Sequence, residues 1–339
     1  MKKIVVIGGG FAGSYIAREL QKDFNVVLID RKDYFEFTPG ILRCLVEPEH
    51  LKNIQVMHKD YFKGQVIVGD VTKVFPDYVV VDGEKIYYDY LVICSGSRYS
   101  MPFKEEDVAI AGRGEDVVRY YEKLGHARKV LIIGGGIVGV ELAGEILWKY
   151  PGKKVVLVHS HDRLIQRCNN SASRYAGDYL RKRGVEIIFN ERVVSRKKNI
   201  FLTNKKREID AELVFLCTGI KANSELLNGF KGVHDKEYVK VNEHLQLLGY
   251  DNIFVAGDVN NIREEKLAQN AEEQAKIVIE NINNLEGGKP LVGYKSKPRI
   301  MVISLGKNFG LLVYKDFTFR GRIPCMIKRW VEKRVMKRY

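Results

Sequence analysis

Three glycines near the start of the chain have the spacing of a phosphate-binding loop. Gly8, Gly10 and Gly13 follow a short apolar segment, and a predicted helix begins at Phe11. Because glycine has no side chain, the backbone can turn tightly there and approach a pyrophosphate at the partly positive helix N-terminus. Asp30 ends the next predicted strand, where an acid accepts hydrogen bonds from ribose hydroxyls. This combination predicts a dinucleotide site.

A second glycine loop repeats this arrangement in the middle of the chain. Gly134, Gly136 and Gly139 lie between an apolar segment and a predicted helix. The ribose position differs, because the following strand ends in His159, with Arg163 nearby in the sequence. An acid there would repel the additional phosphate of NADPH, so its absence predicts NADH use with incomplete discrimination against NADPH. The alternative is that the histidines after this strand are solvated and that other residues set the preference.

Each glycine loop has a partner strand downstream. One predicted strand ends in Cys94-Ser95-Gly96, and another ends in Cys217-Thr218-Gly219. A third strand-helix unit has Gly257-Asp258 after its strand and a helix predicted from about Glu264 to Leu285. If it lies beside the first loop, Asp258 would contact the dinucleotide bound there. The alternative is an aspartate that only caps a loop or helix start.

These units predict an α/β fold with two Rossmann-like domains, the second inserted in the first. We expect the first domain at residues 1–100 and 241–292, the second at residues 101–240, and a short C-terminal cap at residues 293–339. Between the loops, residues 78–81 and 86–92 alternate in polarity around Asp82-Gly83 and predict an antiparallel hairpin.

Length and composition fit a two-domain protein without a membrane-spanning segment. The chain has 339 residues, and no run of about 18 apolar residues occurs. It begins Met-Lys-Lys and leads straight into a strand, so we expect a cytoplasmic protein. The five cysteines are scattered and form no C-x-x-C or C-x4-C pair, which predicts reduced, mostly buried thiols and no metal site.

The excess positive charge is concentrated near the C-terminus. The formal net charge is +14, and residues 315–339 hold nine Lys/Arg against two Asp/Glu. Such a segment indicates an anionic partner, either membrane headgroups or nucleic acid. A helix predicted from Ile323 onward has one apolar side and one charged side, which comprise Ile323, Met326, Ile327, Trp330 and Val331 on the first and Lys328, Arg329, Glu332 and Lys333 on the second.

A basic helix with a tryptophan on its apolar side is typical of the membrane interface. We therefore expect peripheral attachment to the inner face of the cell membrane through this helix, and we do not expect a nucleic-acid partner. The alternative is a helix docked on its own domain with a solvated basic side. The sequence leaves a homodimer open.

Four further segments carry a resemblance to a known family: KDYF at residues 32–35, LCTGIK at 216–221, VNEHLQ at 241–246 and SLGKN at 304–308. Across about residues 1–312 the chain resembles the two-dinucleotide-binding flavoproteins of the pyridine nucleotide-disulfide oxidoreductase superfamily, whose fold is glutathione-reductase-like. The likeness is strongest to type II NADH:quinone oxidoreductases and to apoptosis-inducing-factor-like ferroptosis suppressor proteins.

The resemblance implies an FAD-dependent NAD(P)H:quinone oxidoreductase. FAD would occupy the first loop and NADH the second, with NADPH allowed. Hydride would pass from NADH to flavin N5, and the flavin would reduce a quinone or another small acceptor. The residues expected to bind the cofactors, with Thr38 and Pro39 near the flavin ring, are Gly8, Gly10, Phe11, Ala12, Gly13, Asp30, Arg31, Thr38, Pro39, Ser95, Gly96, Gly134, Gly136, Gly139, His159, Thr218, Gly219, Gly257, Asp258 and Ala268.

Two further residues are expected to act in catalysis. By its position after the second loop, Glu141 matches a glutamate that such enzymes place between nicotinamide and flavin, although a first-turn acid favoured by the helix dipole is the alternative. Gln274 is the polar member of an otherwise apolar helix side and resembles a quinone-contacting glutamine. The alternative is a core glutamine that satisfies neighbouring backbone groups.

The stretch at residues 36–46 departs from the disulfide reductases of this superfamily, because it contains Cys44 and no second cysteine. Electrons would therefore pass directly from flavin to a small acceptor. Two other functions remain open on the sequence. One is sulfide:quinone oxidation, with Cys168 and Cys325 as the candidate cysteines. The other is a redox-gated NADH-binding protein of the apoptosis-inducing-factor type.

Overall fold

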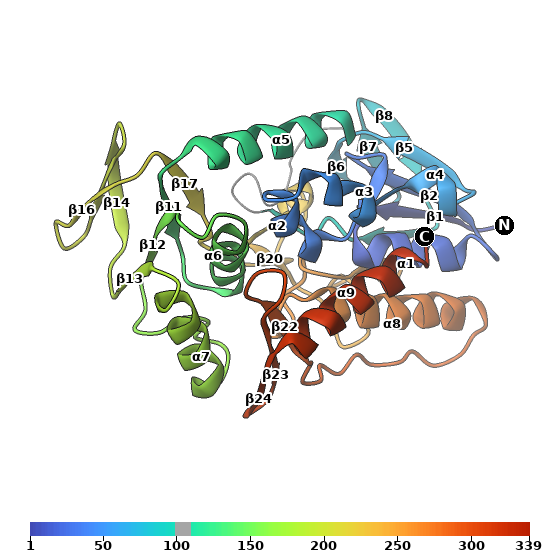
Figure 1. Ribbon diagram of the computed structural model, residues 1–339. Coiled ribbons are helices and arrows are strands. Elements are labelled where there is room, and N and C mark those ends of the chain that lie inside the picture. Colours follow the sequence, from blue (N-terminus) through green and yellow to red (C-terminus); the bar gives the residue numbers. More distant parts are fainter. Residues whose placement is uncertain (99–109) are drawn as a thin grey trace.

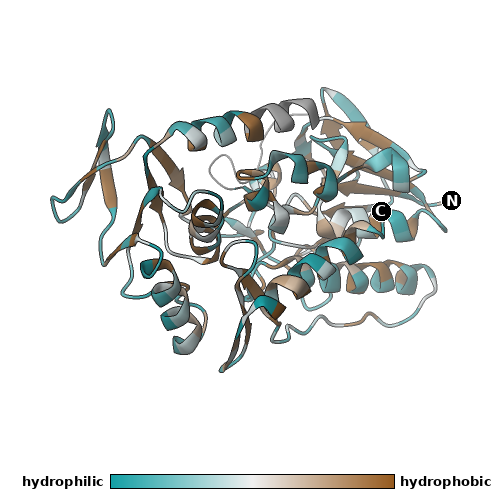
Figure 2. Ribbon diagram, in the orientation of Figure 1, coloured by the Kyte–Doolittle hydropathy of each residue, from teal (hydrophilic) through white to brown (hydrophobic). Residues whose placement is uncertain are grey.

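The computed structural model describes residues 1–98 and 110–339 as a mixed α/β chain (Figure 1). The expected boundary between the first two domains, at residues 100 and 101, lies outside the described residues. The other expected boundaries stay predictions. Parallel strands dominate the two largest sheets, which are mostly brown in Figure 2 because their residues are hydrophobic.

The first sheet of the described chain has five parallel strands in the order β21-β9-β1-β2-β5. These strands are β1 (Lys3–Ile7), β2 (Asn25–Asp30), β5 (Gln65–Val68), β9 (Tyr90–Ile93) and β21 (Ile253–Val255). Because β21 pairs with β9, a segment late in the sequence completes a sheet that begins at residue 3. Helices α1 (Phe11–Leu20) and α8 (Ala268–Glu286) contribute to the hydrophobic core on this sheet, where Ile16, Leu28, Phe254 and Val278 are fully buried.

The second sheet of the described chain repeats the first on a smaller scale, in the order β13-β12-β11-β17. Its strands are β11 (Lys129–Ile133), β12 (Lys154–His159), β13 (Val185–Phe189) and β17 (Leu213–Leu216). Helix α6 (Ile137–Lys149) packs against it through a buried apolar side. The helix ends just before Pro151 and Gly152, as the sequence predicts.

Smaller elements surround these two sheets. The helices are α2 (Ile41–Cys44), α3 (Leu51–Ile54), α4 (His58–Tyr61), α5 (Ile110–His126) and α7 (Asn170–Arg181), with short 3-10 turns η1 (Thr38–Gly40), η2 (Pro48–His50) and η3 (Glu225–Leu227). The strands are β3 (Tyr34–Glu36), β4 (Gln55–Met57), β6 (Val71–Val74), β7 (Tyr78–Val81), β8 (Glu84–Tyr87), β10 (Ser97–Arg98), β14 (Val193–Lys197), β15 (Ile200–Thr203), β16 (Glu208–Asp210), β18 (Lys221–Ala222), β19 (His234–Asp235) and β20 (Tyr238–Val239).

The C-terminal region consists of an antiparallel meander and a long helix. Strands β22 (Met301–Ser304), β23 (Gly310–Tyr314) and β24 (Phe317–Gly321) lead into α9 (Arg322–Met336). Helix α9 packs on the meander and on α3, and the chain then ends near α1 (Figure 1). Within the described residues, no helix is long and apolar enough to cross a lipid bilayer.

Two sequence predictions about local structure need correction. The hairpin β7–β8 forms around Asp82-Gly83, but its second strand ends at Tyr87 and does not continue to residue 92. Asp89 accepts a hydrogen bond from the Lys3 N–H (2.7 Å), which turns the chain into the main sheet as the separate strand β9.

The helix predicted from Glu264 begins at Ala268 instead. The preceding loop is held by Lys266, whose Nζ donates to the carbonyl oxygens of Asn260 (2.7 Å) and Ile262 (3.3 Å). The Ile262 carbonyl also accepts from the Glu264 N–H (2.9 Å), so this segment forms a tight turn and not a turn of α-helix.

Candidate functional site

The two glycine loops border one large cavity of about 1890 Å³. Every predicted cofactor-binding residue lines this cavity except Gly13 and Gly139, and Glu141 lines it as well. Gln274 does not. The strands and helices described above therefore bring together residues from positions 7 to 338 of the chain. That these residues bind cofactors stays a prediction.

The first glycine of each loop requires the absence of a side chain. Gly8 has φ +96° and Gly134 has φ +116°, which L residues with a side chain rarely adopt. A Cβ at Gly8 would overlap the Cys94 carbonyl, and one at Gly134 would overlap the Cys217 carbonyl. In each loop, the carbonyl of the cysteine that follows the partner strand lies against the glycine turn. The two loops therefore share one backbone arrangement.

The third glycine of each loop allows the following helix to pack closely on the loop, and it does not line the cavity. A Cβ at Gly13 would overlap the Gly8 carbonyl oxygen, and one at Gly139 would overlap the Gly134 carbonyl oxygen. The first turns of α1 and α6 therefore sit directly on their loops. Their free N–H groups point the partly positive helix ends at the cavity, where they can receive a pyrophosphate.

The side chain expected to face the ribose differs in chemistry between the two loops, but it occupies the same place relative to the loop backbone. In the first loop, the Gly9 N–H donates to Asp30 Oδ2. In the second, the Gly135 N–H donates to His159 Nδ1 (3.1 Å), so Nε2 carries the proton and donates to Gln166 Oε1 (3.0 Å). Burial lowers the pKa of His159, which keeps the ring neutral. His159 is therefore a structural replacement for the acid of the first loop.

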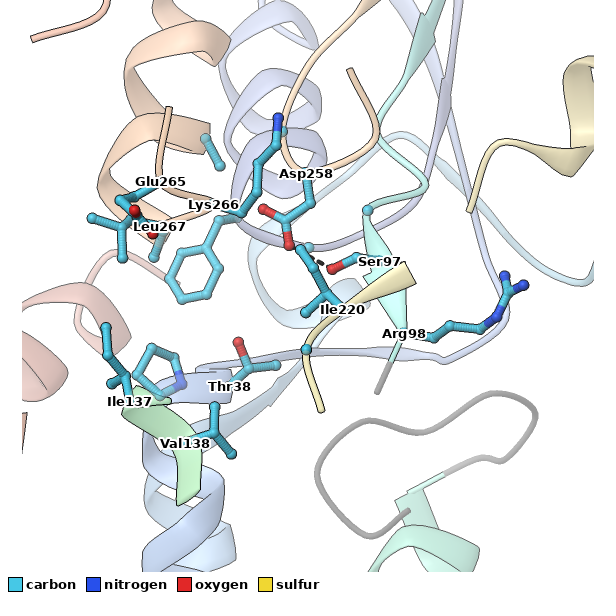
Figure 3. A pocket seen from close by; sticks show the side chains of 18 of the residues that line it. Thr38, Ser97, Arg98, Ile137, Val138, Ile220, Asp258, Glu265, Lys266 and Leu267 are labelled. Atoms are coloured by element: carbon cyan, nitrogen blue, oxygen red, sulfur yellow. Dashed lines mark hydrogen bonds between the residues drawn. The ribbon is translucent and has the colours of Figure 1, made fainter. Parts of the chain in front are cut away.

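Asp258 lies where the third unit approaches the first loop. Its Oδ2 accepts a hydrogen bond from Ser97 Oγ (2.6 Å), which belongs to β10, shortly after the partner strand β9. Figure 3 shows this pair with Lys266 on one side of the cavity and Thr38, Ile137 and Val138 on another. Burial lowers the pKa of Lys266, and the nearby Asp258 opposes this shift. The cavity is thus polar at Asp258, whereas Ile137 and Val138 at the start of α6 present apolar side chains to it.

Gln274 matches the second of the two sequence interpretations. The side chain is 1% exposed, and its Oε1 accepts hydrogen bonds from the Gly257 N–H and from Asn260 Nδ2, both at 2.7 Å. Its Nε2 donates to Glu264 Oε1 (2.7 Å). All of these partners are protein groups, so Gln274 holds the Gly257 loop in place. The predicted catalytic contact with a quinone has no support in this geometry.

Glu141 forms the centre of a polar cluster that the sequence did not reveal. Its Oε1 accepts hydrogen bonds from the Ser304 N–H (2.8 Å), from Ser304 Oγ (3.1 Å) and from Lys328 Nζ (2.6 Å). The carboxylate is 6% exposed, and Lys328 lines the same cavity. Glu141 is not the first-turn acid of the alternative interpretation, because α6 has no acid in its first turn; instead, α9 supplies a cation that compensates the buried charge of Glu141.

The orientation of α9 corrects the predicted division into two sides. Lys328 faces inward with Val331 and Val335, at the spacing of one helix side, and does not lie on a solvated face. Ile323, Met326 and Trp330 are instead exposed, by 54–60%. One side of the helix thus docks on the protein, as the second sequence interpretation expected, while an apolar side remains exposed. Attachment to a membrane stays a prediction. In the sequence, the inward position of Lys328 could have been inferred from its spacing from Val331 and Val335.

The cysteines agree with the prediction of reduced, buried thiols. All five are free and buried. Burial raises the pKa of Cys168 to about 11 and that of Cys94 to about 12. The pKa of Cys325 is also raised by burial. A thiol with a raised pKa is a poor nucleophile, since the thiolate is the reactive form.

Comparisons with known proteins agree with this geometry. The family model described as pyridine nucleotide-disulphide oxidoreductase matches residues 2–275. The apoptosis-inducing factor homolog A of Dictyostelium discoideum is 34% identical, over 96% of this chain and 88% of that protein. Human ferroptosis suppressor protein 1 is 33% identical, over 96% of this chain and 92% of that protein.

A solved structure extends the likeness to the fold of the whole chain. NDH2 of Plasmodium falciparum in complex with NADH superposes with a TM-score of 0.86 at 16% identity, and the match covers 99% of this chain and 94% of that one. The matched family model spans both glycine loops and the Asp258 strand. The chain belongs to the pyridine nucleotide-disulphide oxidoreductase family, whose members are flavoproteins that use FAD and NAD(P)H.

Proposed function

We propose that this flavoprotein is an NAD(P)H:quinone oxidoreductase. The observation that carries the proposal is the Glu141–Lys328 pair, which lies at the cavity shared by both nucleotide loops and by α9. FAD, when bound, supplies the redox chemistry, accepting two electrons from NADH or NADPH and passing them to the acceptor. The residues of the chain bind and orient the cofactors and the acceptor, and they exchange protons with the acceptor.

The first loop fits FAD and the second fits the nicotinamide nucleotide. Each offers a glycine turn with no room for a Cβ and a helix N-terminus directed at the cavity. Asp30 would accept hydrogen bonds from the FAD ribose, and Ser97 would hold Asp258 toward the same cofactor. At the second loop, Ser160, His161 and Arg192 line the cavity beside His159, and none of these three repels a 2′-phosphate. Glu191 lines it as well, but its carboxylate is paired with Arg207 (3.1 Å).

The acceptor side of the cavity is built by the C-terminal region. Met301, Val302 and Ile303 of β22 line it together with Trp330 and Val331 of α9. These apolar groups suit a quinone ring. Reduction of a quinone to a quinol by NADH takes up one proton from water, and Lys328 Nζ is a cation placed at the cavity that can donate it. Glu141 would hold that ammonium group in position.

The sulfide:quinone alternative receives no support from the cysteines. That reaction requires reactive thiolates near the flavin, whereas burial raises the pKa of both Cys168 and Cys325. The redox-gated binding alternative predicts reduction of the flavin by NADH without rapid turnover. These two functions are therefore separable from the proposed one by kinetics.

The test is a steady-state assay with NADH and a short-chain, water-soluble quinone. The proposal expects quinone-dependent turnover that persists in Cys168→Ser and Cys325→Ser. Lys328→Met should lower quinone-dependent turnover by about 10-fold or more, because the proton donor is lost, while stopped-flow reduction of the flavin by NADH falls much less. Flavin reduction without turnover in the wild type would instead support the binding role.

We also propose that α9 attaches the protein to the inner face of the cell membrane. Ile323, Met326 and Trp330 are exposed on one helix side, and the surrounding chain is basic. Tryptophan and aliphatic side chains bury into the headgroup region, and each nearby cation adds about 1 kcal/mol at an anionic surface. A quinone dissolved in the lipid would then enter beside this helix.

A double variant, Ile323→Glu with Met326→Glu, tests the attachment without changing a residue that lines the cavity. It should reduce binding to vesicles with anionic lipid by at least about 10-fold and leave turnover with soluble quinone within about twofold. Val194→Glu is the matched control, since Val194 is 60% exposed on β14. Equal vesicle binding by the double variant and the wild type would exclude attachment through α9.

A further inference from the structure

A fully buried histidine lies beneath the first glycine loop. His58 begins α4 and is 0% exposed. A Cβ at Gly9 would overlap both the His58 ring and Asp30 Oδ2, so the ring sits directly under the loop backbone. His58 belongs to no motif of the sequence, and the function proposed above does not use it.

A chain of hydrogen bonds fixes the proton on one nitrogen of this ring. Ser14 Oγ contacts the Gly9 carbonyl oxygen (2.7 Å), Tyr61 Oη contacts Ser14 Oγ (2.8 Å), and His58 Nδ1 contacts Tyr61 Oη (2.5 Å). A carbonyl can only accept, so the Ser14 proton is used there. Tyr61 must then donate to Ser14, and His58 Nδ1 must donate its N–H to Tyr61.

The other nitrogen faces a carboxylate. His58 Nε2 lies 3.7 Å from Asp30 Oδ2, and the described residues provide no hydrogen-bond partner for it. With the proton already on Nδ1, a neutral ring would present a bare lone pair to a buried anion. Two buried acceptors facing each other are unfavourable, whereas an N–H on Nε2 would turn the contact into an ion pair.

We propose that His58 is a doubly protonated imidazolium that pairs with Asp30 and positions this carboxylate for the FAD ribose. It is a positioning residue, because it acts through Asp30 and does not itself touch the cofactor. The inference rests on the assignment of FAD to the first loop. Its benefit is electrostatic: the imidazolium offsets the Asp30 charge, so the anionic pyrophosphate can approach the loop without repulsion.

The groups around the pair are consistent with this assignment. Burial alone would raise the pKa of Asp30, but His58 and the nearby Lys32 hold it below its usual range. Burial also raises the pKa of Tyr61, which keeps its hydroxyl protonated as the chain requires. The other titratable groups beside Tyr61 are Arg18 of α1 and Tyr339, whose ring lies 4.7 Å from that of Tyr61.

The direct test is the protonation state of His58 in the intact holoprotein. Nitrogen NMR with labelled histidine distinguishes an imidazolium, with two protonated nitrogens, from either neutral tautomer. We expect the imidazolium signature at neutral pH in the wild type, with the signal assigned by its loss in His58→Gln. In Asp30→Asn the signature should disappear, because the ion-pair partner is gone. A neutral His58 in the wild type would overturn the proposal.

The functional test is the affinity for FAD as a function of pH, measured by reconstituting the apoprotein. FAD should bind more weakly, by about 10-fold or more, once the pH is high enough to remove the second ring proton that the proposal places on His58. His58→Gln should bind FAD about 10-fold more weakly than the wild type at neutral pH and lose the pH dependence. An unchanged pH profile in His58→Gln would contradict the proposal.

A control and a second variant separate the possible failures. His234→Gln removes a partly buried histidine outside both glycine loops and should leave the FAD profile unchanged. If Asp30→Ala retained FAD, the assignment of the first loop would fail, whatever the state of His58. If Asp30→Ala lost FAD while His58 proved neutral, only the inference about His58 would fail.

Discussion

The two glycine loops of this chain share a backbone design and differ in electrostatics. In both, the N–H of the second residue of the loop donates to the side chain that ends the next strand. In the first loop this acceptor is the Asp30 carboxylate, with His58 on its buried side. In the second it is the neutral His159, held by Gln166. The loop geometry therefore requires only a hydrogen-bond acceptor at the end of the next strand. The charge of that acceptor can differ between the loops and can select the nucleotide.

The strongest test of the comparison replaces the two acceptors separately. Asp30→Ala should weaken FAD binding by at least about 30-fold, because it removes the ribose acceptor and leaves His58 without its partner. His159→Ala should leave the flavin content unchanged. The ratio of flavin absorption to protein absorption measures both. Full FAD occupancy in Asp30→Ala would show that the loops are wrongly assigned.

Introducing an acid into the second loop should change its nucleotide preference. His159→Asp recreates the first-loop arrangement and places a negative charge where the 2′-phosphate of NADPH would lie. We expect the ratio of kcat/KM for NADH over NADPH to rise by about 10- to 100-fold. The control His161→Asp, two residues further along the chain, should shift the ratio less. No change in His159→Asp would mean that other residues set the preference.

The loops should also respond differently to acid. Burial lowers the pKa of His159, so the folded state resists protonation of this ring. The stability that this provides is present above the unfolded pKa of about 6.5 and is lost as the pH falls below it. Hydrogen exchange at the Gly135 amide, corrected for its intrinsic rate, should therefore accelerate on acidification while Gly9 stays protected. Equal loss of protection from exchange at both amides would indicate general opening of the fold.

The smallest difference is expected between the two cysteines that end the partner strands. Burial raises the pKa of both Cys94 and Cys217. Neither should react with iodoacetamide at neutral pH in the native holoprotein, whereas both should react in denaturant. Mass spectrometry of the intact and digested protein checks this. Rapid native alkylation of either thiol would reopen a thiol-based mechanism at that loop.

Local sequence was sufficient for the features that depend on neighbouring residues. Gly8 and Gly134 were identifiable because their spacing from the other loop glycines and from the helix start is a local pattern, although the carbonyls that exclude a Cβ there belong to the distant Cys94 and Cys217. The fold class followed from the same units, and the family comparison confirms it. The hairpin at Asp82-Gly83 was placed correctly because its turn is local, although its second strand was drawn too long.

Features that depend on distant residues were not accessible in this way. Lys328 lies 187 positions after Glu141, and no local rule relates them. Gln274 was recognised as the polar residue on an apolar helix side, but its partners Gly257 and Asn260 become visible only in three dimensions. His58 carries no motif at all, since its significance comes from lying beneath Gly9.

Helix α9 holds Lys328 at the Glu141 carboxylate and leaves Trp330, two residues further along, 57% exposed. A helix with its side chains is about 10–12 Å across. Any lipid surface that receives the tryptophan would therefore stand within roughly one helix width of the Glu141 carboxylate. A hydrophobic acceptor would travel no further than that between its solvent and its reaction partner, without crossing open water.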